Sequence, residues 1–221
     1  MKPKEFIKKA INKTRKKMSM RHIDSIRAQM RKNLVNKDFT LITNNCIGGI
    51  IYNDLGLKFN SPTVNMAIPM PDFVRFLQNP QKYLEAEVLD CGYSYKGKKN
   101  DYPIARINDM YLWGIHYKSF DELKSKWNER KKRINPNNLF IIGQYIDECT
   151  DETAHDFFKL PYKNKIFLTS GYFDDPCAVH IDVNKLYEKN NVPGADVFTD
   201  TKGTRFYYKH FDFVSWFNSE N

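Results

Sequence analysis

Apolar residues follow two patterns along the chain. Continuous apolar runs at residues 39–43, 139–143 and 165–169 are typical of strands buried on both faces of a parallel sheet. Other stretches carry apolar residues at helical spacing, and these are residues 73–84, 120–134 and 147–158. Because strands and helices alternate, the pattern predicts an α/β fold built on a three-layer, mainly parallel, Rossmann-like sheet.

The middle of the chain departs from this alternation. Residues 88–95 and 102–107 favour strands, and the Gly, Asn and Asp between them are turn formers, so we expect an inserted β-hairpin. A further strand over residues 109–115 would end at His116. Two more elements are expected, a short strand at residues 63–67 and a closing amphipathic helix at residues 205–217.

The net charge of +9 is concentrated at the N-terminus. Residues 1–37 hold 13 Lys and Arg against 2 acidic residues, whereas the rest of the chain is close to neutral. This division predicts a basic amphipathic helical arm at residues 1–37 and a single α/β domain at residues 38–221. Three interpretations of the arm stay open: it lies on an anionic membrane surface, it clamps a polyanion, or it docks on the body through its apolar stripe. Phe6 is its only aromatic residue, which argues against nucleic acid as a partner.

The cysteines and the hydropathy limit which kinds of site and which cellular location we expect. The four cysteines lie far apart without a C-x-x-C pair, so no zinc site or disulfide scaffold is indicated and no metal is expected. No apolar run reaches the length of about 18 residues that a membrane span needs, and the N-terminus lacks the apolar core of a signal peptide. We therefore expect a cytoplasmic protein, with peripheral contact to the inner face of the plasma membrane if residues 1–37 bind lipid.

The turn after the first strand, Asn44-Asn45-Cys46, is the main candidate for chemistry. Ligands of α/β sheets bind at the carboxyl ends of strands, where the next helix presents unpaired N–H groups. A thiol at such a helix start has a lowered pKa, so we predict Cys46 as a nucleophile and Asn44 and Asn45 as oxyanion donors. The alternative is a buried cysteine beside two asparagines that only form the turn and the helix cap.

Further candidates lie at other strand ends. His116 would act as general base if its strand neighbours that of Cys46 in the sheet, and His180 is a second choice. Ser61 and Asn65 flank a short predicted strand and would face the same crevice as Cys46, or they are ordinary turn residues.

A basic run ends the most periodic helix. Ser119 can cap this helix, with Glu122 three residues on completing a capping box. Arg130 and Arg133 lie near its C-terminus, where cations suit the helix dipole. The functional alternative is that they turn inward and hold the phosphates of coenzyme A or the diphosphate of a lipid-linked sugar.

Several motifs together resemble the DUF1919 family of bacterial exopolysaccharide- and capsule-locus proteins. The similarity runs from about residue 37 to the end, and its motifs are Asn44-Asn45-Cys46-Ile47-Gly48-Gly49, Asn60-Ser61-Pro62-Thr63-Val64-Asn65, His116-Tyr117-Lys118-Ser119-Phe120, Trp127, Arg130 and Arg133. The Asn-Cys turn is also similar to that of the coenzyme-A-binding WcbI-type capsule enzymes, although Asn44 replaces their glycine and Ile47 their glutamine.

The resemblance implies acyl transfer, with acetyl-CoA as donor, onto a glycan or lipid-linked sugar during surface-polysaccharide synthesis. It adds Gly48, Tyr117 and Ser119 to the substrate- or cofactor-binding residues. Two alternatives come from other classes. One is a glycosyl- or sugar-phosphate transferase with a carboxylate-bound metal, for which a D-x-D motif is absent. The other is a non-catalytic assembly protein docked on the membrane by its basic arm.

Overall fold

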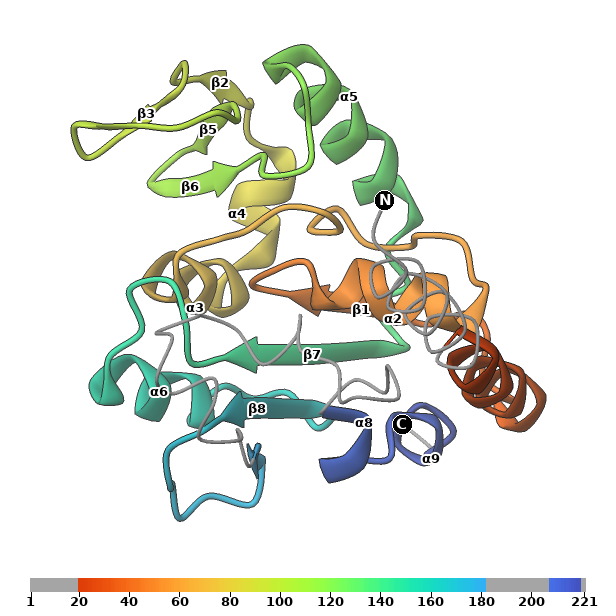
Figure 1. Cartoon of the computed structure of the whole chain (residues 1–221). Helices are drawn as coiled ribbons and strands as arrows, with labels where there is room; N and C mark the ends of the chain where they lie inside the picture. Colours follow the sequence, from red (N-terminus) through yellow and green to blue (C-terminus); the bar gives the residue numbers. More distant parts are fainter. Residues whose placement is uncertain (1–19, 182–206, 220–221) are drawn as a thin grey trace, which may run out of the picture.

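A parallel sheet forms the centre of the fold, with helices on both of its faces (Figure 1). The computed structural model describes residues 20–181 and 207–219, so residues 1–19 of the expected arm and residues 205–206 of the expected closing helix lie outside the described part. In that part the sheet has four strands, which are in spatial order β1 (Thr40–Thr43), β7 (Leu139–Gln144), β8 (Lys165–Thr169) and β9 (Ala178–His180). The α/β class with a parallel sheet, predicted from the sequence, is confirmed.

Each face of the sheet packs into its own apolar cluster. Ile42 of β1 and Ile141 of β7 point into one cluster, whereas their neighbours Leu41 and Phe140 point into the other. The first cluster is covered by α3 (Met70–Gln78), α4 (Pro80–Glu85), α5 (Phe120–Arg130) and α6 (Asp151–Phe158), and the second by a helix over residues 20–33, α2 (Ile47–Leu55) and α9 (Phe213–Phe217). Burial on both faces explains why these strands read as continuous apolar runs.

The first strand and the helix after it form as the sequence predicts. Gly56 ends α2 in the left-handed conformation, with φ of 70°, as expected of a C-terminal glycine. The buried Tyr52 of α2 binds back to the strand: its hydroxyl donates to the Phe39 carbonyl at 3.0 Å and accepts from the Leu41 N–H at 2.8 Å. These two hydrogen bonds fix α2 against the start of β1.

The expected helix over residues 73–84 is two helices. The first, α3, begins at Met70, three residues before the predicted start, and Asn79-Pro80 ends it because Pro80 has no N–H for the helix ladder. Asn79 then caps α4 by accepting from the Lys82 N–H. Asp72 lies inside α3, where its carboxylate accepts from the Tyr111 N–H at 2.7 Å and pairs with Arg75.

The inserted β segment forms its own sheets beside the central one (Figure 1). One is antiparallel and consists of β2 (Leu89–Asp90), β5 (Ile104–Ile107) and β6 (Met110–Trp113), and the other is a small hairpin of β3 (Ser94–Tyr95) and β4 (Lys98–Lys99). The predicted hairpin therefore exists, with the smaller hairpin inserted in it. The expected strand at residues 63–67 is wrong, because only Ala67 pairs, as a single bridge to Trp113.

The remaining helices begin where their capping residues predict. Ser119 accepts from the Glu122 N–H at the start of α5, and Thr150 does the same for Thr153 in α6, which begins at Asp151 and not at Asp147. A 3-10 turn, η1 (Lys131–Arg133), follows α5. The closing segment is two short helices, α8 (Tyr207–His210) and α9, and Asp212 caps the second by accepting from the Ser215 N–H.

The described part of the basic arm packs on the body. Arg27 of the helix over residues 20–33 pairs with the buried carboxylate of Asp54 in α2, with a distance of 2.7 Å between Nε and Oδ1. Arg31 donates from Nε to the Asp54 carbonyl at 2.8 Å, and Leu34 is buried in the second cluster. For residues 20–37 the docked interpretation therefore describes the structure.

Candidate functional site

The carboxyl ends of the four parallel strands lie at one edge of the sheet, where α/β folds bind ligands. Asn44, Asn45 and Cys46 follow β1, and Gln144 ends the neighbouring strand β7. His180 ends β9, three strand spacings or about 14 Å from β1. At that separation His180 cannot take a proton directly from a group at Cys46, so the sheet order argues against the second choice of base.

Asn44 joins the two neighbouring strand ends. Its side chain is fully buried, and it accepts from the Gln144 N–H at 3.0 Å and donates to the Gln144 carbonyl at 3.1 Å. These two bonds continue the β1–β7 ladder beyond the last paired residues. One of the two side-chain N–H groups of Asn44 is therefore engaged with the backbone, and its role as an oxyanion donor stays a prediction for the other.

Asn45 caps the helix. Its Oδ1 accepts from the Ile47 N–H at 2.8 Å, and its Nδ2 donates to Oε1 of Gln144 at 2.8 Å. The sequence analysis did not predict a role for Gln144, although a polar residue directly after the apolar run at residues 139–143 is a usable signal. The structure shows that Gln144 is buried. Gln144 binds both asparagines, so the turn before Cys46 is held rigidly to β7.

The residues around this turn are packed closely. A Cβ on Gly48 would lie 2.9 Å from Oγ1 of Thr43, whose hydroxyl donates to the Asn45 carbonyl at 2.6 Å. Ser61 is buried and hydrogen-bonds Thr63, which in turn accepts from the Thr43 N–H. Gly48 and Ser61, both predicted to bind substrate or cofactor, thus have packing roles at the base of the turn.

Cys46 is half-buried at the first turn of α2. Its carbonyl accepts from the Ile50 N–H, so it opens the helix, and its side chain does not cap it. Asn65 lies over this turn, because a Cβ on Gly49 would be 2.5 Å from its Oδ1. The first turn of a helix carries unpaired N–H groups and the positive end of the helix dipole. The structure thus brings Asn65 to the helix start that Asn44, Asn45, Cys46 and Gly48 form.

His116 does not lie on a strand of the central sheet. It follows β6 of the antiparallel sheet, so the premise that its strand neighbours β1 is wrong. The error arose because an apolar run before a polar residue looks the same in either kind of sheet. The histidine is exposed and makes no hydrogen bond within the described residues, whereas the next residue, Tyr117, donates its hydroxyl to the Val64 carbonyl at 3.0 Å. Val64 precedes Asn65, which links the His116 segment to the start of α2.

Arg130 turns inward, as the functional interpretation of the basic run required. Only 7% of it is exposed, and its Nη1 donates to the Val64 carbonyl and to the Tyr117 hydroxyl, each at 2.8 Å. Its guanidinium carbon lies 5.2 Å from the centre of the Phe59 ring. No carboxylate pairs with it among the residues that the structure describes. Arg130 therefore holds the segment that carries Asn65.

Arg133 and Ser119 have structural partners. Arg133 donates from Nη1 to the Phe59 carbonyl at 3.0 Å and pairs with Glu129. Ser119 caps α5, and Glu122 returns a bond to the Lys118 N–H, one residue before the position that a capping box requires. Both residues thus fix the ends of α5.

Two other cysteines are expected to react slowly. Burial raises the pKa of Cys149 to about 12, and the charge of Asp151 adds to this. Burial likewise raises the pKa of Cys177 to about 12, with help from Asp175. At pH 8 both thiols stay protonated, so we expect iodoacetamide to modify them at least about tenfold more slowly than a free thiol, with rates that still rise above pH 10. Peptide mass spectrometry of timed samples measures this, and fast modification of either at pH 8 would contradict it.

None of the described helices is long and apolar enough to cross a membrane. No group of three or more His, Cys, Asp or Glu side chains in residues 20–181 and 207–219 could hold a metal ion.

Comparison with known proteins identifies the family. The sequence matches the family described as "Domain of unknown function (DUF1919)" over residues 16–218. The chain belongs to the DUF1919 family. A relative in Haemophilus influenzae, named "Uncharacterized protein", is 33% identical over 220 residues, which cover 99% of this chain and 99% of that protein. The DUF1919 match includes the Asn-Cys turn, the His116 segment and α5, so the site described above lies within the family domain.

Proposed function

We propose that this DUF1919 protein is an acyltransferase that moves an acetyl group from acetyl-CoA to a sugar hydroxyl during the synthesis of a bacterial exopolysaccharide or capsule. The observation that supports this is the position of Cys46. Its thiol lies at the first turn of α2, at the carboxyl edge of the parallel sheet, on a turn that Gln144 holds rigid. A positive helix end and a fixed backbone both favour a cysteine nucleophile.

The reaction has two steps. The Cys46 thiolate attacks the acetyl carbonyl of acetyl-CoA, a new C–S bond forms, and coenzyme A leaves as its thiolate and takes up a proton. A sugar hydroxyl then attacks the acetyl-enzyme thioester, passes its proton to a base, and releases the Cys46 thiolate with an ester on the sugar. Because His116 follows β6, outside the central sheet, the sugar proton passes to solvent water in this scheme.

The oxyanion of each step needs hydrogen-bond donors. The side-chain amides of Asn44 and Asn45 each give an N–H to Gln144, and Asn45 accepts from the Ile47 N–H. The donors in this proposal are therefore the backbone N–H groups of Gly48 and Gly49 in the first turn of α2. Arg130 acts as a positioning residue, since its bond to Val64 keeps Asn65 over that turn. We place the reaction in the cytoplasm, where acetyl-CoA is available, with the basic arm as the segment for contact with the inner membrane face.

The first test follows the acetyl group on the protein. After incubation of the full chain with radiolabelled acetyl-CoA, label is expected on Cys46 and absent in Cys46→Ala and Cys46→Ser. Acetyl transfer to a polysaccharide acceptor should fall about a thousandfold or more in both variants. The matched control is Cys91→Ala, which removes another half-buried thiol and should keep full labelling. If Cys46→Ala and Cys46→Ser both retain full transfer, Cys46 is not the nucleophile.

A further inference from the structure

A small pocket with an aromatic lining lies between the β3–β4 hairpin and the loop that follows β7. It has a volume of about 250 Å³ and is lined by Tyr95, Lys96, Lys98, Asn100, Tyr102, Trp113 and Glu148. A pocket below the roughly 300–1,000 Å³ that encloses drug-sized ligands can hold one sugar ring, and it is too small for a whole coenzyme A.

The pocket is close to the Asn-Cys turn. Its floor residue Trp113 pairs through the backbone with Ala67, and the next residue, Ile68, donates its N–H to the Asn44 carbonyl at 2.8 Å. Two spacings of about 5 Å therefore separate the backbone of Trp113 from that of Asn44. Glu148 approaches from the other side, four residues after Gln144. The pocket thus borders the edge of the sheet where Cys46 lies.

The aromatic rings form a corner. The Tyr95 ring lies 5.1 Å from that of Trp113 and 5.0 Å from that of Tyr111, at interplanar angles of 66° and 74°. A flat nucleobase prefers parallel rings on which to stack, and edge-to-face rings do not supply such a slot. The C–H groups of a pyranose are weakly positive, so they can contact the negative faces of rings that meet at an angle.

Polar groups surround these rings. Lys96 donates to both carboxylate oxygens of Glu148 at 2.8 Å, and the Tyr95 hydroxyl donates to the same carboxylate at 3.3 Å. Lys98 has no ion pair within the described residues, so its ammonium group is available to an anionic ligand group. Burial raises the pKa of Tyr102, with a contribution from Asp147, so its phenol remains protonated and can donate.

The loop that carries Glu148 has an unusual backbone. Asp147 and Glu148 have φ of 51° and 66°, and Lys96 on the facing hairpin turn has φ of 49°. Such values are costly for residues other than glycine and persist where the surrounding contacts enforce them. Here the Met70 N–H holds the Asp147 carbonyl at 2.8 Å, and Lys96 holds Glu148. The two strained segments meet at the pocket, which therefore has a defined shape before a ligand arrives.

We propose that this pocket binds one hexopyranose unit and prefers an anionic one, such as a hexuronate. The ring would lie against Tyr102 and the Tyr95–Trp113 corner, with its hydroxyls on Asn100 and Glu148 and its carboxylate on Lys98. Its role as the acceptor subsite of acyl transfer rests on the proposed function, whereas the binding itself does not.

The test uses the full chain and two probes that differ in one group, methyl glucuronide and methyl glucoside, titrated by ligand-observed NMR at low salt. Both should bind, and the glucuronide should bind about two- to fivefold more tightly because of Lys98. Tyr102→Ala should weaken both about tenfold, and Tyr102→Phe should retain most of the affinity. Lys98→Ala should remove only the preference for the glucuronide. The control is Tyr172→Ala, an exposed tyrosine outside the pocket, which should change nothing.

Three outcomes would overturn the pocket assignment. They are the absence of binding by both glycosides at tens of millimolar, affinities that Tyr102→Ala leaves unchanged, and binding of adenosine monophosphate in place of the sugars. Two results separate this proposal from the proposed function. If the native chain binds the sugars but transfers no acetyl group, the proposed reaction is wrong and the pocket assignment holds. If Cys46 is labelled by acetyl-CoA but neither sugar binds, the pocket assignment is wrong and the proposed reaction holds. Cys46→Ala should bind the sugars as the native chain does.

Discussion

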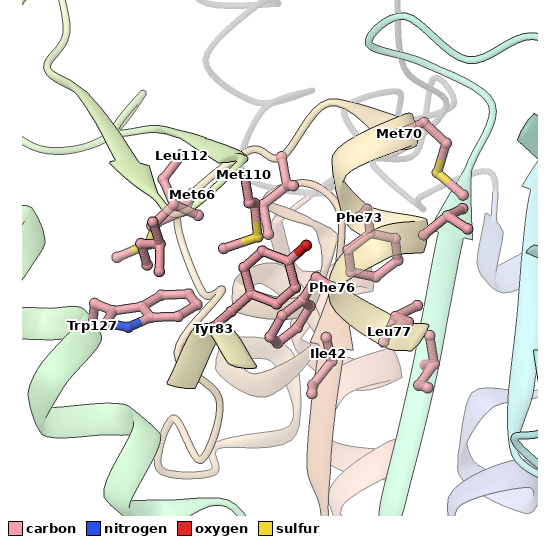
Figure 2. Packing of buried hydrophobic residues seen from close by; sticks show 14 of the residues in the cluster. Ile42, Met66, Met70, Phe73, Phe76, Leu77, Tyr83, Met110, Leu112 and Trp127 are labelled. Carbon is pink, nitrogen blue, oxygen red and sulfur yellow. The ribbon is translucent and has the colours of Figure 1, made fainter. Parts of the chain in front are cut away.

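Replacement of Trp127 by alanine is expected to lower the free energy of unfolding by about 3–5 kcal/mol. Trp127 is fully buried where α5 packs on α3 and α4, and its ring centre lies 6.2 Å from that of Phe76. Figure 2 shows its ring reaching from α5 toward Tyr83 within the first apolar cluster. Alanine would leave a cavity that three different elements border, and such a site collapses poorly. Urea unfolding followed by circular dichroism measures the loss.

The matched variant is Trp127→Phe. The indole N–H of Trp127 is buried and has no acceptor within the described residues, so phenylalanine removes an unsatisfied donor and leaves no partner behind. We expect a cost of about 1–2 kcal/mol, from the lost volume alone. If Trp127→Ala costs no more than Trp127→Phe, the ring does not fill the space between α5 and α4.

The parts of the fold that the sequence predicts well are those specified by local signals. The run at residues 139–143 and the run at residues 165–169 match β7 and β8 closely, because strands covered on both faces need uninterrupted apolar residues. Ser119 and Gly56 mark a helix start and a helix end because capping depends on the residue itself. Pro80 was equally visible, and the single helix predicted across it overlooked the effect of proline.

The candidate site was less predictable because its geometry depends on which strands pair. The run at residues 110–113 has the same apolar pattern in either kind of sheet, and only its antiparallel pairing with β5 separates His116 from the end of β1. The bonds from Gln144 to Asn44 and Asn45 join residues about a hundred positions apart. Local propensity carries no information on such pairs, so the sequence does not predict that Asn44 and Asn45 hold the turn to β7.

Replacement of Asn44 by alanine is expected to cost about 1–3 kcal/mol of unfolding free energy, because it takes the acceptor from the buried Gln144 N–H and removes one of the two donors to the Gln144 carbonyl, which the Ile146 N–H still binds. Thermal and urea unfolding both report this loss. The matched control is Asn53→Ala, which removes an exposed asparagine from α2 and should change stability by less than about 0.5 kcal/mol. A loss as small in Asn44→Ala as in Asn53→Ala would mean that the two hydrogen bonds do not tie β1 to β7.

Asn44→Asp separates structure from chemistry at the same position. The carboxylate can still accept from the Gln144 N–H, but it faces the Gln144 carbonyl without a proton to donate. At neutral pH the variant should therefore be destabilised, and acidification should restore part of the loss, since burial favours the protonated form that can donate again. The direction of this pH dependence follows from linkage. If the introduced carboxyl has a higher pKa in the folded state than in the unfolded state, the variant is most stable below the unfolded pKa and loses stability as the pH rises through the folded pKa. If Asn44 only positions the turn, labelling of Cys46 by acetyl-CoA in the acidified variant should recover along with stability, measured relative to the native chain at the same pH. Labelling that stays below that of the native chain while stability recovers would instead indicate that the Asn44 amide acts on the reacting carbonyl.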